Sequence, residues 1–272
     1  MLNAIGLRDL PAPDAHELIS IHQVIEGEGI QRLVSGAASM FSTSEFRTYR
    51  DATKTLSGVM GYSSLMRVTL GGDAPQEVAG TLVTCNYVDV LRQPPTLGPG
   101  FSSDCDAEGT PTVVLGHDLW RTTFGADPAI VGPDVLLDRQ AFTVVGVAPE
   151  GVRGVAIEPA SYFAPIATQS LLRPGFDVYR GEWSWLTLVG RRTGDASLAQ
   201  VRAELGVIAA RIDRQQPPRR TTLVVERARP LSSPEARRET VPVGVVIMTA
   251  FLLSPAMAFS VARRGRIVSV SH

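Results

Sequence analysis

Residues 185–229 contain a strand–helix–strand pattern: WLTLVGRR at 185–192, SLAQVRAELGVIAARIDRQQ at 197–216 and TTLVVERAR at 221–229. The outer pieces are rich in β-branched residues and predict strands. The middle piece predicts an amphipathic helix, because its apolar residues recur at the spacing of one helix face. These residues are Leu198, Val201, Leu205, Ile208 and Ile212. Two prolines, Pro217 and Pro218, end this helix.

Upstream of this unit, shorter elements alternate without a regular repeat. Ser42 and Glu45 have the spacing of a capping box, which predicts a helix that ends near Gly58. Further strands are predicted at 59–70, 76–84, 112–116, 135–147 (a hairpin turning at 138–140) and 161–164, and further short helices at 86–91, 117–124 and 166–172. Short strands mixed with a few helices indicate an α+β architecture.

The overall composition excludes few functions but gives no sign of nucleic-acid binding. The 272 residues include 26 basic and 27 acidic side chains, for a formal net charge of −1. A chain of this length can hold one large domain or two small ones without metals or disulfides. Its balanced charge gives no reason to expect nucleic acid or a strongly acidic ligand as a partner.

The C-terminal part contains a candidate membrane helix. Residues 241–262 carry no charged side chain, and as a helix they would span about 33 Å, enough to cross a bilayer core. Arg263, Arg264 and Arg266 follow directly, and arginines beside a span usually stay in the cytoplasm. This pattern predicts a transmembrane helix at 241–262 and a cytoplasmic tail at 263–272.

The same pattern places the preceding residues outside the cell membrane. Residues 231–240 are polar and predict a linker, so residues 1–240 would stand on the extracytoplasmic side. The alternative is a buried core helix, since Gly244, Ser254 and Pro255 interrupt the apolar run. The N-terminal stretch MLNAIGLRDLPAPD lacks the basic start and apolar core of a signal peptide. A truncated or split reading frame would explain why this stretch does not resemble a signal peptide although a membrane span is predicted downstream.

Residue patterns of known catalytic or metal sites are not found in the sequence. A phosphate-binding glycine loop is missing, and Lys54 is the only lysine. The histidines, His16, His22, His117 and His272, have no partners at metal-ligand spacing. His117 and Asp118 are adjacent and therefore do not face each other on a helix. We therefore expect no catalytic, cofactor-binding or metal-binding residues, no cofactor, and no enzyme activity.

The cysteines and tryptophans each allow two interpretations. Cys85 and Cys105 could pair in an extracytoplasmic domain, whereas in a cytoplasmic one they would more often be ordinary small side chains. Without another indication, we expect them to be unpaired. The aromatic residues Trp120, Trp183 and Trp185 could line a ligand groove, but core packing is the expectation.

The middle of the chain contains an ordered series of residues within VVLGHDLWRTTFGADPAIVGPDVLLDRQAFTVVGVAPEGVRG at 113–154. The series is Leu119–Trp120, Phe124–Gly125, Asp127–Pro128, Val131–Gly132, and Val144 to Val147 with Pro149. In this series the chain resembles a known family, the periplasmic core domains of MacB-like ABC transporter permeases, especially the large duplicated permeases of acidobacterial type. Weaker similarity at 86–101, at 7–18 and around ARRGR at 262–266 extends the resemblance over residues 7–266.

The resemblance implies a domain organisation. It comprises a post-membrane segment at 1–16, a porter-like βαβ subdomain at 17–70 and 185–230, an inserted β-rich subdomain at 71–184, the linker at 231–240, the membrane helix at 241–262 and the tail at 263–272. The family also has a membrane helix before this point and further helices after it.

The implied function is mechanical. The domain would transmit nucleotide-driven motion of membrane helices to the periplasmic side of the inner membrane for export. The implied partners are a separate ATP-binding subunit, the other permease membrane helices and a periplasmic adaptor protein. Two departures are Pro133, where the family more often has a basic residue, and Ser254–Pro255 in the last helix. The alternative function is a soluble or membrane-tethered module that binds a ligand or partner without an ATPase.

Overall fold

The computed structural model describes residues 10, 12–27, 35–36, 39–106, 111–152, 154–155, 159–180 and 183–229. The predicted linker, membrane helix and tail at 231–272 lie outside these residues, as do residues 1–9. No helix in the described part has both the length and the apolar character that crossing a membrane requires.

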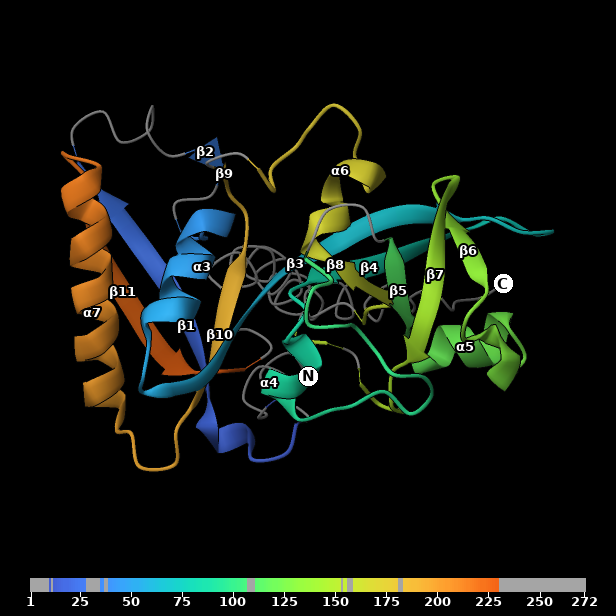
Figure 1. Ribbon diagram of the computed structural model, residues 1–272, viewed down its shortest axis with the longest axis horizontal. Helices are drawn as coiled ribbons and strands as arrows, with labels where there is room; N and C mark the ends of the chain where they lie inside the picture. Colours follow the sequence, from blue (N-terminus) through green and yellow to red (C-terminus); the bar gives the residue numbers. More distant parts are fainter. Residues whose placement is uncertain are drawn as a thin grey trace, which may run out of the picture.

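Strands and helices follow the order that the sequence predicts for most of the chain (Figure 1). The strands are β1 (Leu18–Glu26), β2 (Ser35–Gly36), β3 (Leu56–Leu70), β4 (Gln76–Val83), β5 (Thr112–Leu115), β6 (Asp134–Leu137), β7 (Gln140–Val147), β8 (Tyr162–Pro165), β9 (Trp183–Ser184), β10 (Thr187–Arg192) and β11 (Arg220–Arg227). The α-helices are α3 (Thr43–Ala52), α4 (Tyr87–Leu91), α5 (His117–Thr123), α6 (Gln169–Leu172) and α7 (Leu198–Gln215).

Nine of the described strands form one sheet in the order β11-β1-β10-β3-β4-β8-β5-β7-β6. Strands β2 and β9 form a separate parallel pair. The mixture of antiparallel and parallel pairs, together with α3 and α7 beside one end of the sheet, is a mixed α and β fold. The α+β class expected from the sequence is consistent with this arrangement.

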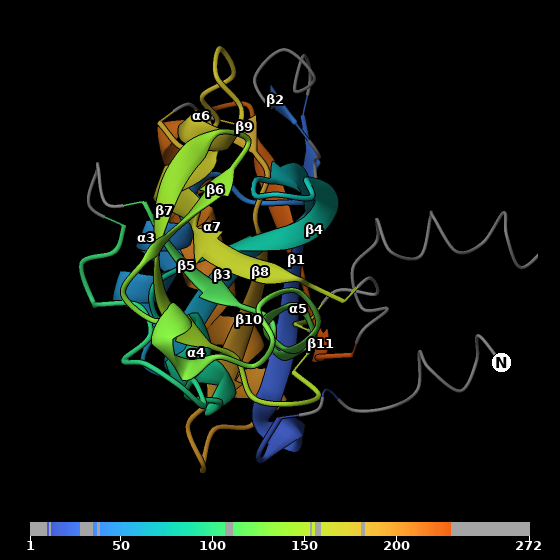
Figure 2. The same ribbon diagram turned by 90° about the vertical axis from the view of Figure 1, so that its right-hand side faces the viewer.

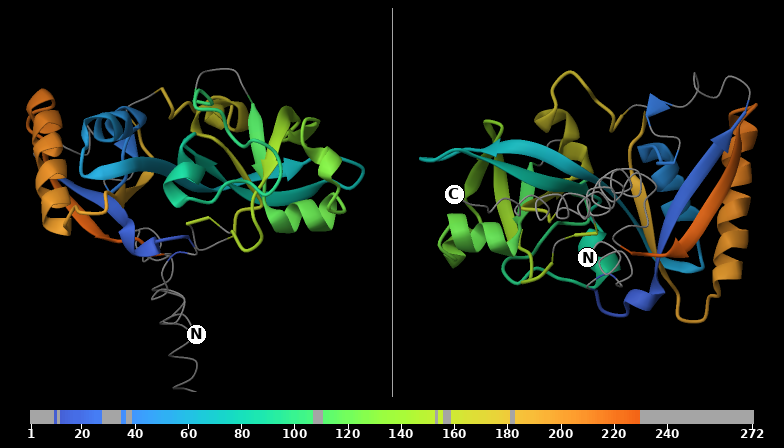
Figure 3. Two further views of the ribbon diagram at one scale, coloured as in Figure 1. Left: turned by 60° about the horizontal axis from the view of Figure 1, so that its bottom comes forward. Right: turned by 180° about the vertical axis from the view of Figure 1, so that it is seen from behind.

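Strand β3 joins two lobes that lie at opposite ends of the long axis (Figures 1 and 3). Its first part, Leu56 to Tyr62, pairs with β10, and its second part, Tyr62 to Leu70, pairs with β4. We call the lobe of β11, β1, β10, α3 and α7 the α7 lobe, and the lobe of β4, β8, β5, β7 and β6 the β7 lobe. Figure 2 looks from the β7 end of the molecule. A register shift between Ser63 and Met66 marks a bulge where β3 passes between the lobes.

Helix α7 confirms the amphipathic pattern. A capping box of Ser197 and Gln200 begins the helix, satisfying two backbone donors that would otherwise lack partners. Its apolar face is buried against the sheet, as the residues Val201, Leu205, Ile208, Ala209 and Ile212 show. The neighbouring strands β10 and β11 follow the prediction within a few residues.

Helix α3 has the predicted capping box of Ser42 and Glu45 but ends at Ala52, not near Gly58. Glu204 of α7 accepts hydrogen bonds from the backbone N–H groups of Lys54 and Thr55 at 2.8 and 2.9 Å. These bonds stop the helix, and the chain enters β3 at Leu56. A carboxylate 150 positions away in the sequence therefore determines where α3 ends.

The strand predicted at 185–192 is also different in the structure. Residues Trp183 and Ser184 form β9, which pairs with β2, while β10 begins only at Thr187. Between them, the backbone of Leu186 pairs with Phe41 as an isolated bridge. The predicted strand therefore begins two residues later than expected, because Leu186 pairs with Phe41.

The two chain ends of the described domain lie side by side. Strands β1 and β11 are antiparallel, with Ile19 opposite Arg227, and the Ala228 N–H donates to the Leu18 carbonyl at 3.0 Å. The start of β1 and the end of β11 are therefore at the same end of the molecule.

Candidate functional site

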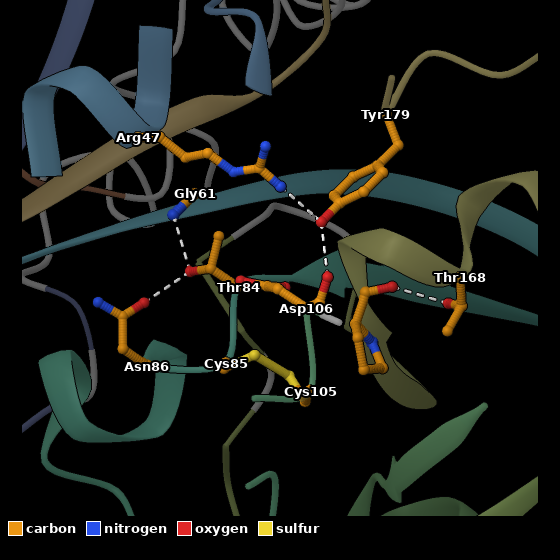
Figure 4. Close-up of a disulfide and its surroundings, with 10 residues drawn as sticks. Arg47, Gly61, Thr84, Cys85, Asn86, Cys105, Asp106, Thr168 and Tyr179 are labelled. Carbon is orange, nitrogen blue, oxygen red and sulfur yellow. Dashed lines mark hydrogen bonds between the residues drawn. A yellow bond between two sulfur atoms is a disulfide. The ribbon is translucent and has the colours of Figure 1, made fainter. Parts of the chain in front are cut away.

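The junction between the lobes brings several side chains to β3 just before its bulge. The Thr84 hydroxyl accepts a hydrogen bond from the Gly61 N–H at 3.1 Å and donates to the side-chain oxygen Oδ1 of Asn86 at 2.8 Å. The Asn86 amide in turn donates to the Val59 carbonyl at 2.8 Å. These bonds attach the start of α4 to β3 (Figure 4).

A disulfide between Cys85 and Cys105 closes the loop that contains α4. The Cα atoms are 5.6 Å apart and both residues are buried. The expectation of unpaired cysteines is therefore wrong. Residues 20 positions apart in sequence meet here because α4 and the loop after it return to the end of β4, and nothing in the local sequence indicates that return.

A chain of hydrogen bonds crosses from one lobe to the other beside the disulfide. Arg47 of α3 donates to the Tyr179 hydroxyl at 2.7 Å, and that hydroxyl donates to the Asp106 carbonyl at 2.7 Å (Figure 4). The Arg47 guanidinium also lies 5.3 Å from the centre of the Tyr179 ring, within the range of cation–π attraction. Helix α3 of the α7 lobe is thereby linked to the residue next to Cys105.

Burial raises the pKa of the Asp106 carboxyl, and the nearby Arg50 and Arg47 oppose that rise. Its Oδ1 atom is buried without a hydrogen-bond partner among the described residues. The carboxyl and the sulfur atoms of Cys85 and Cys105 lie within 4.8 Å of one another. Because the sulfur atoms are bonded to each other, they do not act as thiolate ligands, and this group does not form a metal site.

A small apolar pocket lies next to α4 in the β7 lobe, with a cavity volume of about 20 Å³. Tyr87, Phe101 and Phe163 are among its lining residues. Burial raises the pKa of the Tyr87 hydroxyl, so that this group stays neutral. A volume of about 20 Å³ holds roughly one water molecule and is far below the roughly 300–1,000 Å³ of ligand pockets, so this pocket gives little support to ligand binding as the main role.

The histidines singled out in the sequence are dispersed. His16 is exposed, and His22 is buried in β1. His117 begins α5 and lies with its ring centre 5.5 Å from that of Trp120, while the neighbouring Asp118 is exposed. His272 is outside the described residues. The structure brings none of the three described histidines together with another.

The tryptophans follow the packing expectation in two cases out of three. Trp185 is buried and donates to the Thr43 hydroxyl at 3.1 Å. Trp120 is half-buried against the core. Trp183 is 38% exposed, and its ring meets that of Phe176 edge-on at 4.9 Å. For Trp183 the core-packing prediction is wrong, because β9 lies in a two-stranded pair outside the main sheet.

The sequence patterns indicate no site residue, and they do not indicate the junction residues either. Arg47 and Tyr179 are 132 positions apart, and each is an ordinary polar residue in its own segment. No spacing rule connects them, so only the folded sheet reveals the junction.

The two lobes and the disulfide define a class of protein: a mixed α and β domain of an oxidising, extracytoplasmic compartment, where disulfides persist. The family model described as "MacB-like periplasmic core domain" matches residues 13–208, more than half of the chain. The chain therefore belongs to the family of MacB-like periplasmic core domains of ABC transporter permeases, as its sequence resemblance implied.

Solved structures with the same fold come from this class. The extracellular domain of the noncanonic ABC-type transporter YknZ from Gram-positive bacteria has a TM-score of 0.55 and 13% identity, covering 76% of this chain and 99% of that one. The periplasmic region of MacB from Actinobacillus actinomycetemcomitans has a TM-score of 0.56 and 13% identity, covering 89% and 95%.

A domain of a putative permease protein from Porphyromonas gingivalis also has a TM-score of 0.56 and 13% identity, covering 86% of this chain and 99% of that one. At this identity the similarity shows the fold alone. A search of curated proteins gives no match to this chain.

Proposed function

We propose that this chain is the extracytoplasmic core domain of an ABC transporter permease that transmits nucleotide-driven motion of membrane helices for export. In this proposal it has no catalytic activity of its own. It works with a separate ATP-binding subunit and with other permease membrane helices at the inner membrane, with its C-terminus in the cytoplasm. Membership of the family supports the general role.

The observation that carries the proposal is the pairing of the two chain ends. The Ala228–Leu18 hydrogen bond and the antiparallel pairing of β1 with β11 bring the entry and exit of the domain together. Segments that precede and follow the domain therefore leave it from the same end. The membrane helix that the family has before this segment and the one proposed at 241–262 would then stand side by side beneath the domain.

The division into a porter-like subdomain at 17–70 and 185–230 and an insert at 71–184 is part of the proposal. The α7 lobe and the β7 lobe support it, since they contain most of these residues. Relative motion of two packed units is a common way to transmit a conformational change. In this molecule the bulge of β3 is where such bending would concentrate.

An exposed aromatic surface supports the proposal of an adaptor partner. Phe176 and Trp183 are 48% and 38% exposed and in contact, and Leu171 of α6 is 36% exposed. α6 and β9 lie at the end of the molecule opposite to the start of β1 (Figure 1). Aromatic side chains are enriched in protein interfaces, so we propose that a periplasmic adaptor binds this end.

The first experiment is external proteolysis of spheroplasts that contain the full chain. Digestion of residues 1–240 together with survival of a C-terminal membrane fragment is the expected result. Co-purification of an ATP-binding subunit from the same membranes is the second expected result. A chain that is protected from the protease, or that is found in the cytosol, would overturn the proposed topology and role.

A further inference from the structure

Arg191, near the end of β10, is a buried cation whose bonds join its own strand to two other parts of the chain. Its side chain is 2% exposed. Nε donates to the Val90 carbonyl of α4 at 2.6 Å, and Nη1 donates to the Glu17 carboxylate at 2.9 Å. Longer bonds run from Nη1 to the Asp14 carbonyl at 3.3 Å and from Nη2 to the Pro13 carbonyl at 3.0 Å.

The three parts that meet at Arg191 belong to different units. Arg191 itself is in the α7 lobe. Helix α4 follows β4 of the β7 lobe and is anchored there, since the Tyr87 ring packs on Phe163 of β8 with ring centres 5.7 Å apart. Residues 13–17 precede β1 and form the segment through which the chain enters the domain. We call residues 13–17 the entry segment.

A second arginine, from the end of α4, holds the same entry segment. Arg92 forms ion pairs with Asp14 and with Glu17, the latter at 3.4 Å. Glu17 is thus shared between Arg191 of the α7 lobe and Arg92 beside the β7 lobe. Because Arg92 and Asp14 are about half exposed, their pair contributes little by itself, and the buried Arg191 is the stronger link.

Apolar packing makes the same three-way connection. One cluster of buried side chains contains Leu10 before the entry segment, Val90 and Leu91 of α4, and Val189 of β10. It also contains Leu18 and Ala228, which mark the paired chain ends. The entry segment is therefore connected to closely packed atoms of both lobes. Because close-packed interiors transmit strain, a displacement of the entry segment would be passed to both lobes.

We propose that Arg191 is a positioning residue that couples movement of the entry segment to both lobes at once. The proposal rests on the proposed function, in which the entry segment continues from a membrane helix. Arginine suits this position because its planar guanidinium group has five N–H donors in a fixed fork, directed here at acceptors in α4 and the entry segment. A lysine would keep the charge but bind these acceptors as a single compact ammonium group.

The test compares Arg191→Lys with Arg219→Lys in the full chain. Arg219 is a matched control, because it is also a buried arginine, 7% exposed, that pairs with carboxylates of Glu45 and Asp213. All of these partners belong to the α7 lobe or its connecting turn, and none to the entry segment or α4. Both variants therefore keep the positive charge at the substituted position but lose the planar, forked guanidinium group.

The first readout is hydrogen exchange by mass spectrometry, which needs no nucleotide. In Arg191→Lys, the amide hydrogens of α4 and of residues 14–18 are both expected to exchange at least about tenfold faster than in the parent chain. This factor corresponds to the loss of one hydrogen bond to a charged group. Amides of α7 are expected to be unchanged. Arg219→Lys is expected to accelerate exchange in the α7 lobe but not in α4. Unchanged exchange of α4 in Arg191→Lys would overturn the proposal.

The second readout is the distance between spin labels on the two lobes in membranes that contain the ATP-binding subunit. Val207 of α7 and Asp118 of α5 are exposed and suit single cysteine replacements, since Cys85 and Cys105 are paired. A non-hydrolysable ATP analogue is expected to shift this distance in the parent chain and in Arg219→Lys, but not in Arg191→Lys. A normal shift in Arg191→Lys would overturn the proposal.

The two readouts separate the failure of this proposal from failure of the proposed function. If the parent chain shows no nucleotide-dependent shift while exchange of α4 and the entry segment rises together in Arg191→Lys, the permease role fails and the link through Arg191 stands. If hydrogen exchange in α4 does not change in Arg191→Lys, the proposed link through Arg191 is wrong, whether or not the nucleotide shifts the distance between the spin labels.

Discussion

Arg219 is surrounded by partners that come from three elements of the α7 lobe. It forms a short ion pair with Glu45 of α3, and its Nε lies 3.2 Å from the Asp213 carboxylate of α7. Its Nη2 also donates to the Gln23 side chain of β1 at 3.2 Å. Removing one partner of a buried ion pair leaves the other charge without compensation, and this costs more than the pair itself contributes.

We expect Arg219→Met to lower the free energy of unfolding by about 3–5 kcal/mol. Urea unfolding of the purified chain, followed by circular dichroism, measures the change. Arg50→Met is the control, because Arg50 pairs with Asp51 at the surface, where both side chains are at least 38% exposed, and exposed pairs contribute about 0–1 kcal/mol. Equal losses in the two variants would contradict the argument.

Glu204 gives the stability of the fold a pH dependence. Burial raises the pKa of its carboxyl, but hydrogen bonds from the hydroxyl and N–H of Thr55, the N–H of Lys54 and the hydroxyl of Thr53 outweigh burial, so the pKa lies below its usual value of 4.5. A lowered pKa in the folded state stabilises the fold above the pKa of the unfolded chain, and this contribution is lost as the pH falls through the folded value.

We expect Glu204→Gln to lower the free energy of unfolding by about 1 kcal/mol at pH 7, because the carboxylate is partly exposed to solvent. The difference from the parent chain is expected to shrink as the pH falls below 4.5. Urea unfolding between neutral and acidic pH measures it. Glu77→Gln is the control, since Glu77 is 67% exposed in a surface pair. A stability difference between Glu204→Gln and the parent chain that grows toward acidic pH would contradict the expected direction of the pH dependence.

At the scale of elements, the loop from β4 through α4 to Asp106 depends on the disulfide for its position. Closing a loop of 20 residues stabilises a fold by about 3 kcal/mol, mainly by restricting the unfolded chain. We expect the double variant Cys85→Ala, Cys105→Ala to lose about this amount in urea unfolding. The parent chain under reducing conditions should show the same loss. A reduced parent chain as stable as the oxidised one would exclude this role for the disulfide.

Elements stabilised by local contacts could be predicted from the sequence. The capping box at Ser42 and the apolar face of α7 depend on residues within a few positions of each other, and the structure has both of them. The end of α3 could not be predicted, because Glu204 of another helix fixes it. The pairing of Cys85 with Cys105 is a similar case, since it depends on how α4 folds back.

At the scale of the whole molecule, the continuous sheet was not foreseen. Strand β3 runs through both lobes and pairs with β10 at one end and β4 at the other, a continuity that the separate strand predictions do not contain. Strand patterns show that a segment is extended but not which neighbours it will find. The same limitation hid the junction residues Arg47, Tyr179 and Asp106, which lie on α3 and in two loops that meet only in the folded chain.

A shared strand should make the two lobes unfold together. Both buried clusters also extend through the two lobes; one of them joins Ile19 and Val59 to Leu137 and Phe142. Unfolding either lobe alone would expose the apolar side chains and backbone groups that it shares with the other. We therefore expect one cooperative transition, as is usual for single folding units.

Tryptophan fluorescence can test this expectation for each lobe separately. The double variant Trp183→Phe, Trp185→Phe leaves Trp120 as a reporter of the β7 lobe, and Trp120→Phe, Trp183→Phe leaves Trp185 as a reporter of the α7 lobe. The urea midpoint of each reporter should coincide with the circular dichroism midpoint of the same variant. If the midpoints separated, the lobes would be autonomous and free to move apart. If they coincide, any motion passed through this domain must bend the sheet, and the bulge of β3 is where the sheet is least regular.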